Sequence, residues 1–390
     1  MKKITYLTYA ALLTLGSCTN EINEEGFVDK ANTISFNAYS NKTRANDYVS
    51  GDVTIAEMKK GSFGVVGYKT SDNSLYLGST NKAIEQVWKT DASYTGDGYW
   101  DYKVSSELKY WPQENMDFYA YFPYSAQGDV FAQSDASGNV MIITNESGNQ
   151  DILFARESGV SQTNYVPLYF KHALSKLKAV YIKVNAVDVQ VDVQKITFLN
   201  TSTKGKIKVD YSGNASYEPT SRDVPRFFDF TSEPKTITYN ANPSTTYEGV
   251  ELFDNDDNGY IFATNTNLKH NVKGTGKSLW SAGDKTSLGS STLPNSSLVC
   301  MELDCKVIAA GHYLVGSADA YGKMYIPMHG TSSNNADISE LLAGRRYTYK
   351  VVMESNVGYD ENGDPIMLAP IRFSVNEVTE WNDVTVTINL

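Results

Sequence analysis

The segment Ile34–Ala45 has the sequence ISFNAYSNKTRA, and its first half alternates between apolar and polar side chains. Ile34, Phe36 and Ala38 alternate with Ser35, Asn37 and Tyr39. Because successive side chains of a strand point to opposite faces, this period of two predicts a half-buried β-strand. A short polar run then leads to Arg44, the first arginine of the chain. The sequence therefore predicts a strand that is joined to the remaining chain through a polar connection containing an arginine.

The composition indicates an ordered, acidic, all-β protein. The chain has 390 residues, of which 41% are hydrophobic and 20% charged, so it is long enough for two domains and typical of a folded chain. Its net charge of −11 argues against a nucleic-acid partner, because phosphate binding requires a basic surface. The 27 tyrosines, together with short apolar runs between Gly, Asn, Asp and Ser clusters, favour β-sheets.

The N-terminal residues have the pattern of a secretion signal. Lys2 and Lys3 precede an apolar run, Ile4–Leu15, that is too short to cross a bilayer as a helix. The sequence Leu15-Gly16-Ser17-Cys18 matches a lipobox, which predicts a signal peptide at 1–17 and a lipid anchor on Cys18. Several acyl chains anchor a protein stably in a membrane. An ordinary signal peptide with a chance cysteine is the alternative.

Five segments of the chain share motifs with one protein family. They are Tyr110-Trp111-Pro112, Phe118–Pro123 (FYAYFP), Asp151–Ala155 (DILFA), Val166–Leu177 (VPLYFKHALSKL) and Leu341–Val351 (LLAGRRYTYKV). These segments, with Ile34–Ala45, resemble the fimbrillins, the type V pilins of Bacteroides-like bacteria. The resemblance extends from Ile34 to Trp381 and is most specific in the fourth segment.

The resemblance implies an all-β fold of two tandem transthyretin-like β-sandwich domains after the lipoprotein signal peptide. On this basis we expect a lipidated propeptide or tether at 18–44, which includes the first strand. An N-terminal domain at 45–163 and a C-terminal domain at 164–390 follow, with the boundary in the polar stretch Glu157–Tyr165.

The resemblance also implies a route of assembly. An arginine-specific protease cuts between Arg44 and Ala45, and the strand carrying Ile34, Phe36 and Ala38 is displaced by a strand from another pilin subunit. The candidate donor is the alternating C-terminal segment with Val384, Val386, Ile388 and Leu390, although this segment could equally close its own domain. The expected location is the outer membrane for the lipoprotein precursor and then the cell surface or fimbrium.

Other candidate sites are weaker. Asp254, Asp256 and Asn258 match the start of a calcium loop, but Asn265 stands where the bidentate glutamate belongs, so an Asx-rich turn is the alternative. Cys300 and Cys305 lie an odd number of residues apart, which predicts opposite faces of one strand and no mutual disulfide. We interpret both as small buried hydrophobes and His172 as a structural histidine. We expect no metal and no cofactor.

Three classes of function compete. The first is a pilus subunit that supports adhesion. The second is a monomeric surface lipoprotein that binds glycans through exposed aromatic residues such as Trp88, Trp100 and Trp280. The third is an enzyme, which we reject because no nucleophile, zinc motif or carboxylate pair occurs in a recognisable frame. The sequence does not distinguish a shaft, tip or anchor subunit and names no receptor.

Overall fold

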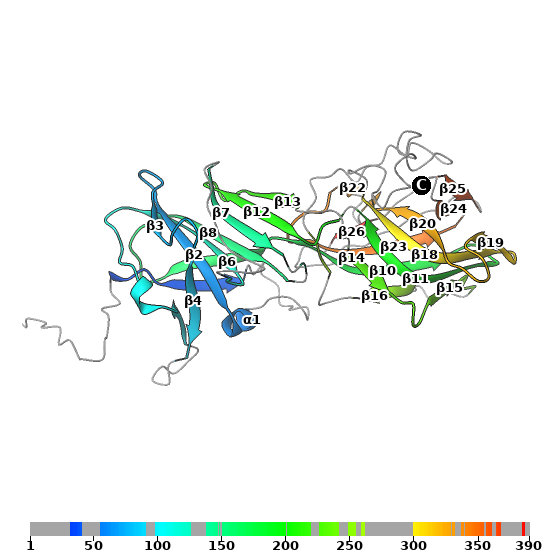
Figure 1. Cartoon of the computed structure of the whole chain (residues 1–390), viewed down its shortest axis with the longest axis horizontal. Coiled ribbons are helices and arrows are strands. Elements are labelled where there is room, and N and C mark those ends of the chain that lie inside the picture. The colour runs from blue at the N-terminus through cyan, green and yellow to red at the C-terminus, as the bar shows by residue number, and fades with distance from the viewer. Residues whose placement is uncertain are drawn as a thin grey trace, which may run out of the picture.

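The chain forms two β-sandwich units that lie end to end along its long axis (Figure 1). The computed structural model describes residues 32–40, 55–90, 98–125, 138–146, 148, 150–199, 201–219, 226–241, 249–254, 259–261, 299–328, 330–331, 337–338, 340–354, 356–360, 364–367 and 384–386. Within these ranges almost all regular structure is β, which confirms the predicted fold class. No helix within the same ranges is long and apolar enough to cross a membrane.

The N-terminal unit is built on an eight-stranded sheet in the order β1-β9-β8-β6-β2-β4-β5, with β3 paired to β2. The strands are β1 (Phe36–Ser40), β2 (Ser62–Lys69), β3 (Leu75–Leu77), β4 (Ile84–Lys89), β5 (Tyr99–Tyr102), β6 (Met116–Phe122), β8 (Leu153–Val160) and β9 (Val166–His172). β1 lies at one end of this order and runs parallel to β9, whereas the other pairs are antiparallel. The predicted first strand is therefore an edge strand of the N-terminal sheet.

Both faces of this sheet are buried at its central strand β6. Along β6, Phe118, Ala120 and Phe122 belong to one core, which also contains Met58 of helix α1 (Ile55–Lys60). Tyr119 and Tyr121 belong to a second core, beneath a three-stranded sheet in the order β13-β12-β7. The strands of that sheet are β7 (Asn139–Asn145), β12 (Gly205–Asp210) and β13 (Ala215–Pro219). β6 is therefore a central strand with aromatic side chains on both faces.

The C-terminal unit packs a five-stranded sheet against an eight-stranded sheet around the third core. The first sheet has the order β16-β10-β23-β26, with β17 paired to β10; its strands are β10 (Ser175–Val184), β16 (Val250–Asp254), β17 (Tyr260–Ile261), β23 (Arg346–Met353) and β26 (Val384–Val386). The second has the order β14-β11-β18-β20-β24-β25, with β15 and β19 as side branches. Its strands are β11 (Val189–Leu199), β14 (Arg226–Asp229), β15 (Lys235–Thr238), β18 (Cys300–Ala309), β19 (His312–Val315), β20 (Gly322–Pro327), β24 (Asn356–Tyr359) and β25 (Pro365–Met367).

The boundary expected between residues 163 and 164 is wrong by one strand. β9 begins at Val166, yet its backbone pairs with β8 and β1 and its side chains Leu168 and Phe170 lie in the N-terminal core. The chain first crosses to the C-terminal unit between β9 and β10. It also returns, because β12 and β13 pair with β7 after β11 has already joined a C-terminal sheet.

A short strand pair precedes β23 in the chain. Asp337–Ile338 forms β22 and pairs with β21 (Gly330–Thr331). Gly344 has a φ of +68° and lies in a turn before β23. The glycine therefore supplies the left-handed conformation that this strand-to-strand connection requires.

Candidate functional site

β1 is the edge strand of the N-terminal sheet, and we call the position that it fills beside β9 its seat. Its parallel register with β9 is regular. Phe36 pairs with Val166, Ala38 with Leu168 and Ser40 with Phe170. The amide of Val166 donates a hydrogen bond to the carbonyl of Ser35 at 2.8 Å. Since β1 has β9 as its only ladder partner among the described strands, removing β1 exposes the backbone groups of β9 to a new strand.

The inner face of β1 is buried in aromatic surroundings. The exposed fractions of Ile34, Phe36 and Ala38 are 0%, 1% and 4%. The Phe36 ring meets Phe118 edge to face at a centroid distance of 5.4 Å and Phe63 at 6.4 Å. Phe63 in turn contacts Phe170 at 5.5 Å and Trp100 at 4.8 Å. We call the cluster of Phe63, Phe118, Phe170 and Trp100, which Phe36 joins through its contacts with Phe63 and Phe118, the aromatic box.

A second segment holds the start of β1 from its other edge. The amide of Ile34 donates to the carbonyl of Lys109, and the amide of Trp111 donates to the carbonyl of Asn32, both at 2.9 Å. The hydroxyl of Tyr102 on β5 donates to the carbonyl of Ile34, also at 2.9 Å. Burial raises the pKa of Tyr102, which keeps this donor protonated. We call Lys109–Trp111 the clamp.

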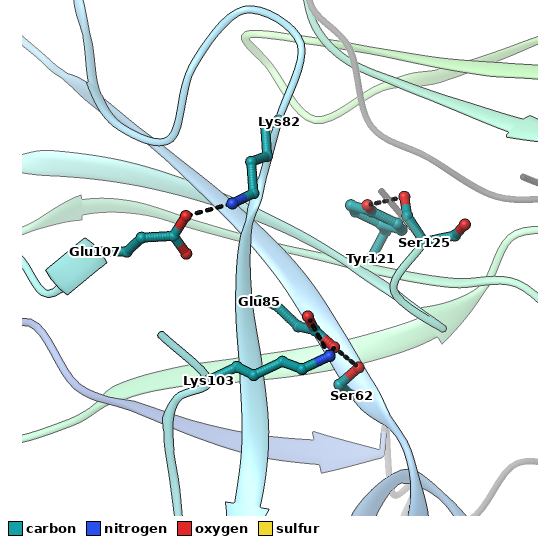
Figure 2. Close-up of polar contacts among 7 residues, drawn as sticks. All are labelled: Ser62, Lys82, Glu85, Lys103, Glu107, Tyr121 and Ser125. Atoms are coloured by element: carbon teal, nitrogen blue, oxygen red, sulfur yellow. Dashed lines mark hydrogen bonds and ion pairs between the residues drawn. The ribbon is translucent and has the colours of Figure 1, made fainter. Parts of the chain in front are cut away.

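Polar contacts fix the segment that leads to the clamp (Figure 2). Lys103 forms an ion pair at 2.9 Å with Glu85 on β4, and Glu85 also accepts a hydrogen bond from Ser62 at 2.6 Å. Lys82 pairs with Glu107 in the 3₁₀ turn Ser105–Glu107, and this contact raises the pKa of Lys82. Each exposed pair contributes little energy. Together they hold both sides of the turn and so position the clamp beside β1.

The outer face of β1 is open and carries a stacked tyrosine pair. Tyr39 on β1 and Tyr169 on β9 have ring centroids 5.2 Å apart and are 40% and 52% exposed. The side-chain amide of Asn37 donates to the Tyr39 hydroxyl at 2.8 Å. This face therefore contributes side-chain contacts that do not require desolvation, whereas the inner face supplies most of the apolar burial.

The described part of the candidate donor segment lies in its own C-terminal unit. Val384 and Val386 are in β26, which pairs in parallel with Tyr347 and Tyr349 of β23 at the edge of the five-stranded sheet. Ile388 and Leu390 lie outside the described residues, as do Cys18, Arg44 and Ala45. The structure thus places Phe36–Ser40 in a sheet and leaves the displacement of this strand, lipidation, cleavage and donation as predictions.

The calcium candidate is only partly described. Asp254 is the exposed last residue of β16 and pairs with Ala179, whereas Asp256 and Asn258 lie outside the described residues. Among the described residues no cluster of His, Cys, Asp or Glu has the arrangement of a metal site. The weak calcium site therefore stays a prediction.

Two predictions about single residues are confirmed. Cys300 and Cys305 are both buried and free of disulfides, and Cys305 lies in the C-terminal core with Leu303 and Val307 while Cys300 does not. The His172 Nδ1 atom lies 2.8 Å from Oδ2 of the buried Asp151, which is a structural contact between β9 and the segment that leads into β8.

The glycan-binding alternative loses part of its basis. Trp100 is only 3% exposed, because it forms a wall of the aromatic box. Trp88 is half-buried and packs edge to face on Trp100 at 5.5 Å, with the Lys59 ammonium 4.1 Å from its ring centroid. Trp280 lies outside the described residues. The expectation that Trp88 and Trp100 are exposed was wrong.

One comparison with known protein families gives a match over most of the chain. The model of the fimbrillin-like family matches residues 43–363, which is most of the chain. The chain belongs to the fimbrillin-like family. Membership supports a role of this fimbrillin-like protein in a pilus or in adhesion at the cell surface, implies polymerisation with other pilin subunits and favours a non-enzymatic protein.

Solved structures are similar to this fimbrillin-like protein at low identity. A fimbrial protein from Bacteroides vulgatus is 15% identical, with a TM-score of 0.46, over 83% of this chain and 95% of that chain. A proposed cell adhesion protein from Bacteroides ovatus is 13% identical, with a TM-score of 0.36, over 83% and 91%. A proposed adhesin from Bacteroides thetaiotaomicron is 12% identical, with a TM-score of 0.34, over 93% and 100%. The comparison with curated proteins finds no match.

Proposed function

We propose that the protein is a pilus subunit that is exported as a lipoprotein, cut after Arg44 and polymerised by strand exchange. In this proposal β1 is a temporary occupant of its seat, and a strand from a neighbouring subunit replaces it. The partners are other pilin subunits, the outer-membrane lipid before maturation and an arginine-specific protease. The resulting fibre would support adhesion.

One observation carries the proposal: β1 completes the N-terminal core although it precedes the proposed cut. Ile34 and Phe36 are fully or almost fully buried, and β1 is held by hydrogen bonds on both edges at its start. Burying two such side chains stabilises a fold by about 3–6 kcal/mol. A strand with these contacts is part of the folded unit, and its removal leaves an apolar groove that requires a replacement.

The proposed cut makes that removal thermodynamically accessible. Residues 41–54 connect β1 to helix α1, so the uncut strand remains at high effective concentration near its seat. After cleavage at Arg44 the peptide that contains β1 is a separate molecule, which is diluted once it dissociates. The same cut separates the chain from the proposed lipid on Cys18.

The test is cleavage and assembly of Arg44 variants in the cell. Arg44→Ala should accumulate as a monomeric, membrane-attached precursor. Arg44→Lys keeps the positive charge but lacks the side chain that the protease requires, so it should behave in the same way. Cys18→Ser serves as the matched control for the anchor, because it should lose the lipid while it keeps Arg44 as a cleavage site. Fibres of normal length from both Arg44 variants would refute the maturation step.

A further inference from the structure

Gln86 on β4 is a fully buried side chain whose amide group has no hydrogen-bond partner among the described residues. Its exposed fraction is 0%, and neither the amide nitrogen nor the amide oxygen is bonded to another group. Water satisfies both atoms in an unfolded chain, so burying them unpaired costs free energy. Because native proteins pair most of their buried polar groups, this exception requires a physical reason.

The side chain of Gln86 faces the same core as the aromatic box. Along β4 it shares a face with Ile84, which belongs to that core, and with Trp88, which packs against it. Across the sheet its backbone pairs with Phe63 on β2 and with Tyr102 on β5. Side chains of directly paired residues lie on the same face of a sheet. Apolar and aromatic side chains therefore surround the amide.

Both residues that pair with Gln86 also contact β1. The Phe63 ring lies 6.4 Å from the Phe36 ring, measured between centroids, and the Tyr102 hydroxyl donates to the carbonyl of Ile34 at 2.9 Å. Ile34 and Phe36 therefore close the part of the core in which Gln86 lies. When β1 leaves, Phe63 and Tyr102 lose these contacts, and water gains access to the amide between them.

We propose that Gln86 makes β1 releasable, because its amide is unpaired while β1 is in its seat and becomes hydrated when β1 leaves. This inference rests on the proposed strand exchange and adds the residue that controls its first step. The unpaired amide raises the free energy of the chain with β1 seated, but not that of the chain with an open seat. It thereby offsets part of the stabilisation that the burial of Ile34 and Phe36 provides.

An apolar residue of similar length should therefore hold β1 more firmly. Methionine is unbranched like glutamine and needs no hydrogen-bond partner. The amide of Val166 donates to the carbonyl of Ser35 at 2.8 Å, so its hydrogen exchanges with solvent when β1 leaves. Hydrogen exchange at Val166 in the uncut, full-length chain thus measures the opening of the seat without requiring a cut at Arg44. All chains carry Cys18→Ser, which removes the proposed lipid.

Gln86→Met should slow hydrogen exchange at Val166 roughly tenfold. Thr144→Val is the matched control. The Thr144 hydroxyl on β7 is also buried and has no partner in the described part of the chain, but it lies in the three-stranded sheet. This control should raise the urea midpoint of unfolding and leave hydrogen exchange at Val166 unchanged. Gln86→Leu is a second apolar variant and should act in the same direction as Gln86→Met.

Three results overturn the inference and leave the pilus role intact. The first is unchanged or faster hydrogen exchange at Val166 in both folded Gln86 variants. The second is equal slowing in Thr144→Val, because hydrogen exchange at Val166 then reports unfolding of the whole unit. The third is failure of both Gln86 variants to fold, because the amide then stabilises the unit.

Release of β1 after maturation gives a second measurement. The same chains are cut by an arginine-specific protease, and the free peptide that contains β1 is quantified by mass spectrometry. Gln86→Met should release this peptide roughly tenfold more slowly than Thr144→Val does, and equal rates contradict the inference. An unmodified cut chain that never releases the peptide refutes the proposed strand exchange instead. Hydrogen exchange at Val166 then still decides whether Gln86 promotes opening of the seat.

Discussion

Phe36 on β1 and Phe118 on β6 meet edge to face, with ring centroids 5.4 Å apart and ring planes inclined by 82°. β6 is a central strand of the N-terminal sheet, whereas β1 is at the edge of the sheet order. The contact therefore joins the first described strand of the chain to the middle of the N-terminal core. It makes that core dependent on a segment that the proposed maturation removes.

Phe36→Ala in the uncut chain should lower the free energy of unfolding of the N-terminal unit by about 3–5 kcal/mol, because it empties the aromatic box. Urea titration followed by tryptophan fluorescence measures this change, since Trp100 is a wall of the box. The matched control is Phe227→Ala, which removes a ring that is 54% exposed. Similar losses in the two variants would show that β1 does not complete the core.

Tyr102→Phe should weaken the attachment of β1 while preserving the packing of the ring. The variant removes the donor to the carbonyl of Ile34, which costs about 0.5–1.5 kcal/mol. We expect faster release of the peptide that contains β1 after cleavage, measured by mass spectrometry of the released fragment. Tyr110→Phe is the control, because that ring is 51% exposed. Equal release rates for Tyr102→Phe and the unmodified chain would argue against this hydrogen bond.

Stability should fall in alkaline solution because of buried tyrosines. Burial raises the pKa of Tyr359 from its ordinary value of 10.0 to about 12. The folded state thus holds this proton more tightly than the unfolded state. The contribution of this proton to the free energy of unfolding is complete below pH 10.0 and is lost as the pH rises through about 12. The total loss is about 3 kcal/mol. Tyr347 has its pKa raised to about 12 in the same way, chiefly by burial, and adds to the decline.

Tyr359→Phe should make that decline shallower. The measurement is the free energy of unfolding in urea at about pH 9 and about pH 11, compared between this variant and the unmodified chain. Tyr313→Phe, in which the ring is 42% exposed, should leave the decline unchanged. A decline of identical slope in all three proteins would disprove the assignment to Tyr359.

Cys300 and Cys305 should be unreactive toward a thiol reagent until the C-terminal unit unfolds. Both are buried, and burial raises the pKa of each thiol, so the reactive thiolate is scarce in the folded state. A Cys18→Ser chain treated with a disulfide reagent such as Ellman's should release colour only in denaturant. Rapid labelling without denaturant would contradict the burial.

A local pattern of sequence was sufficient to predict β1, and the central strand β6 has the same kind of pattern. In both, apolar residues recur with the period of a strand, and this period survives whatever the strand later packs against. The buried state of Cys300 and Cys305 and the structural contact of His172 followed from the same kind of pattern.

The assignment of β9 could not be predicted locally. Val166, Leu168 and Phe170 are apolar enough for either unit, and only pairing with β1 and β8 places them in the first. The return of β12 and β13 to the N-terminal unit depends on the same kind of long-range pairing.

The clamp was missed for a similar reason. It holds β1 through backbone groups of Lys109 and Trp111 and a single bridge at Tyr110, which require no particular side chains. Its sequence signal is confined to Tyr110-Trp111-Pro112, a motif that indicates aromatic packing but not a contact with a strand so far away in the chain.

The direction of β1 has a consequence for a fibre as a whole. β1 runs parallel to β9, and β26 runs parallel to β23. If every joint of a filament has the parallel arrangement seen on β9, the filament is polar. Each copy then donates a strand at one joint and accepts a strand at the next. Elongation and termination are then distinct events, and a subunit that lacks either feature would cap the filament instead of extending it.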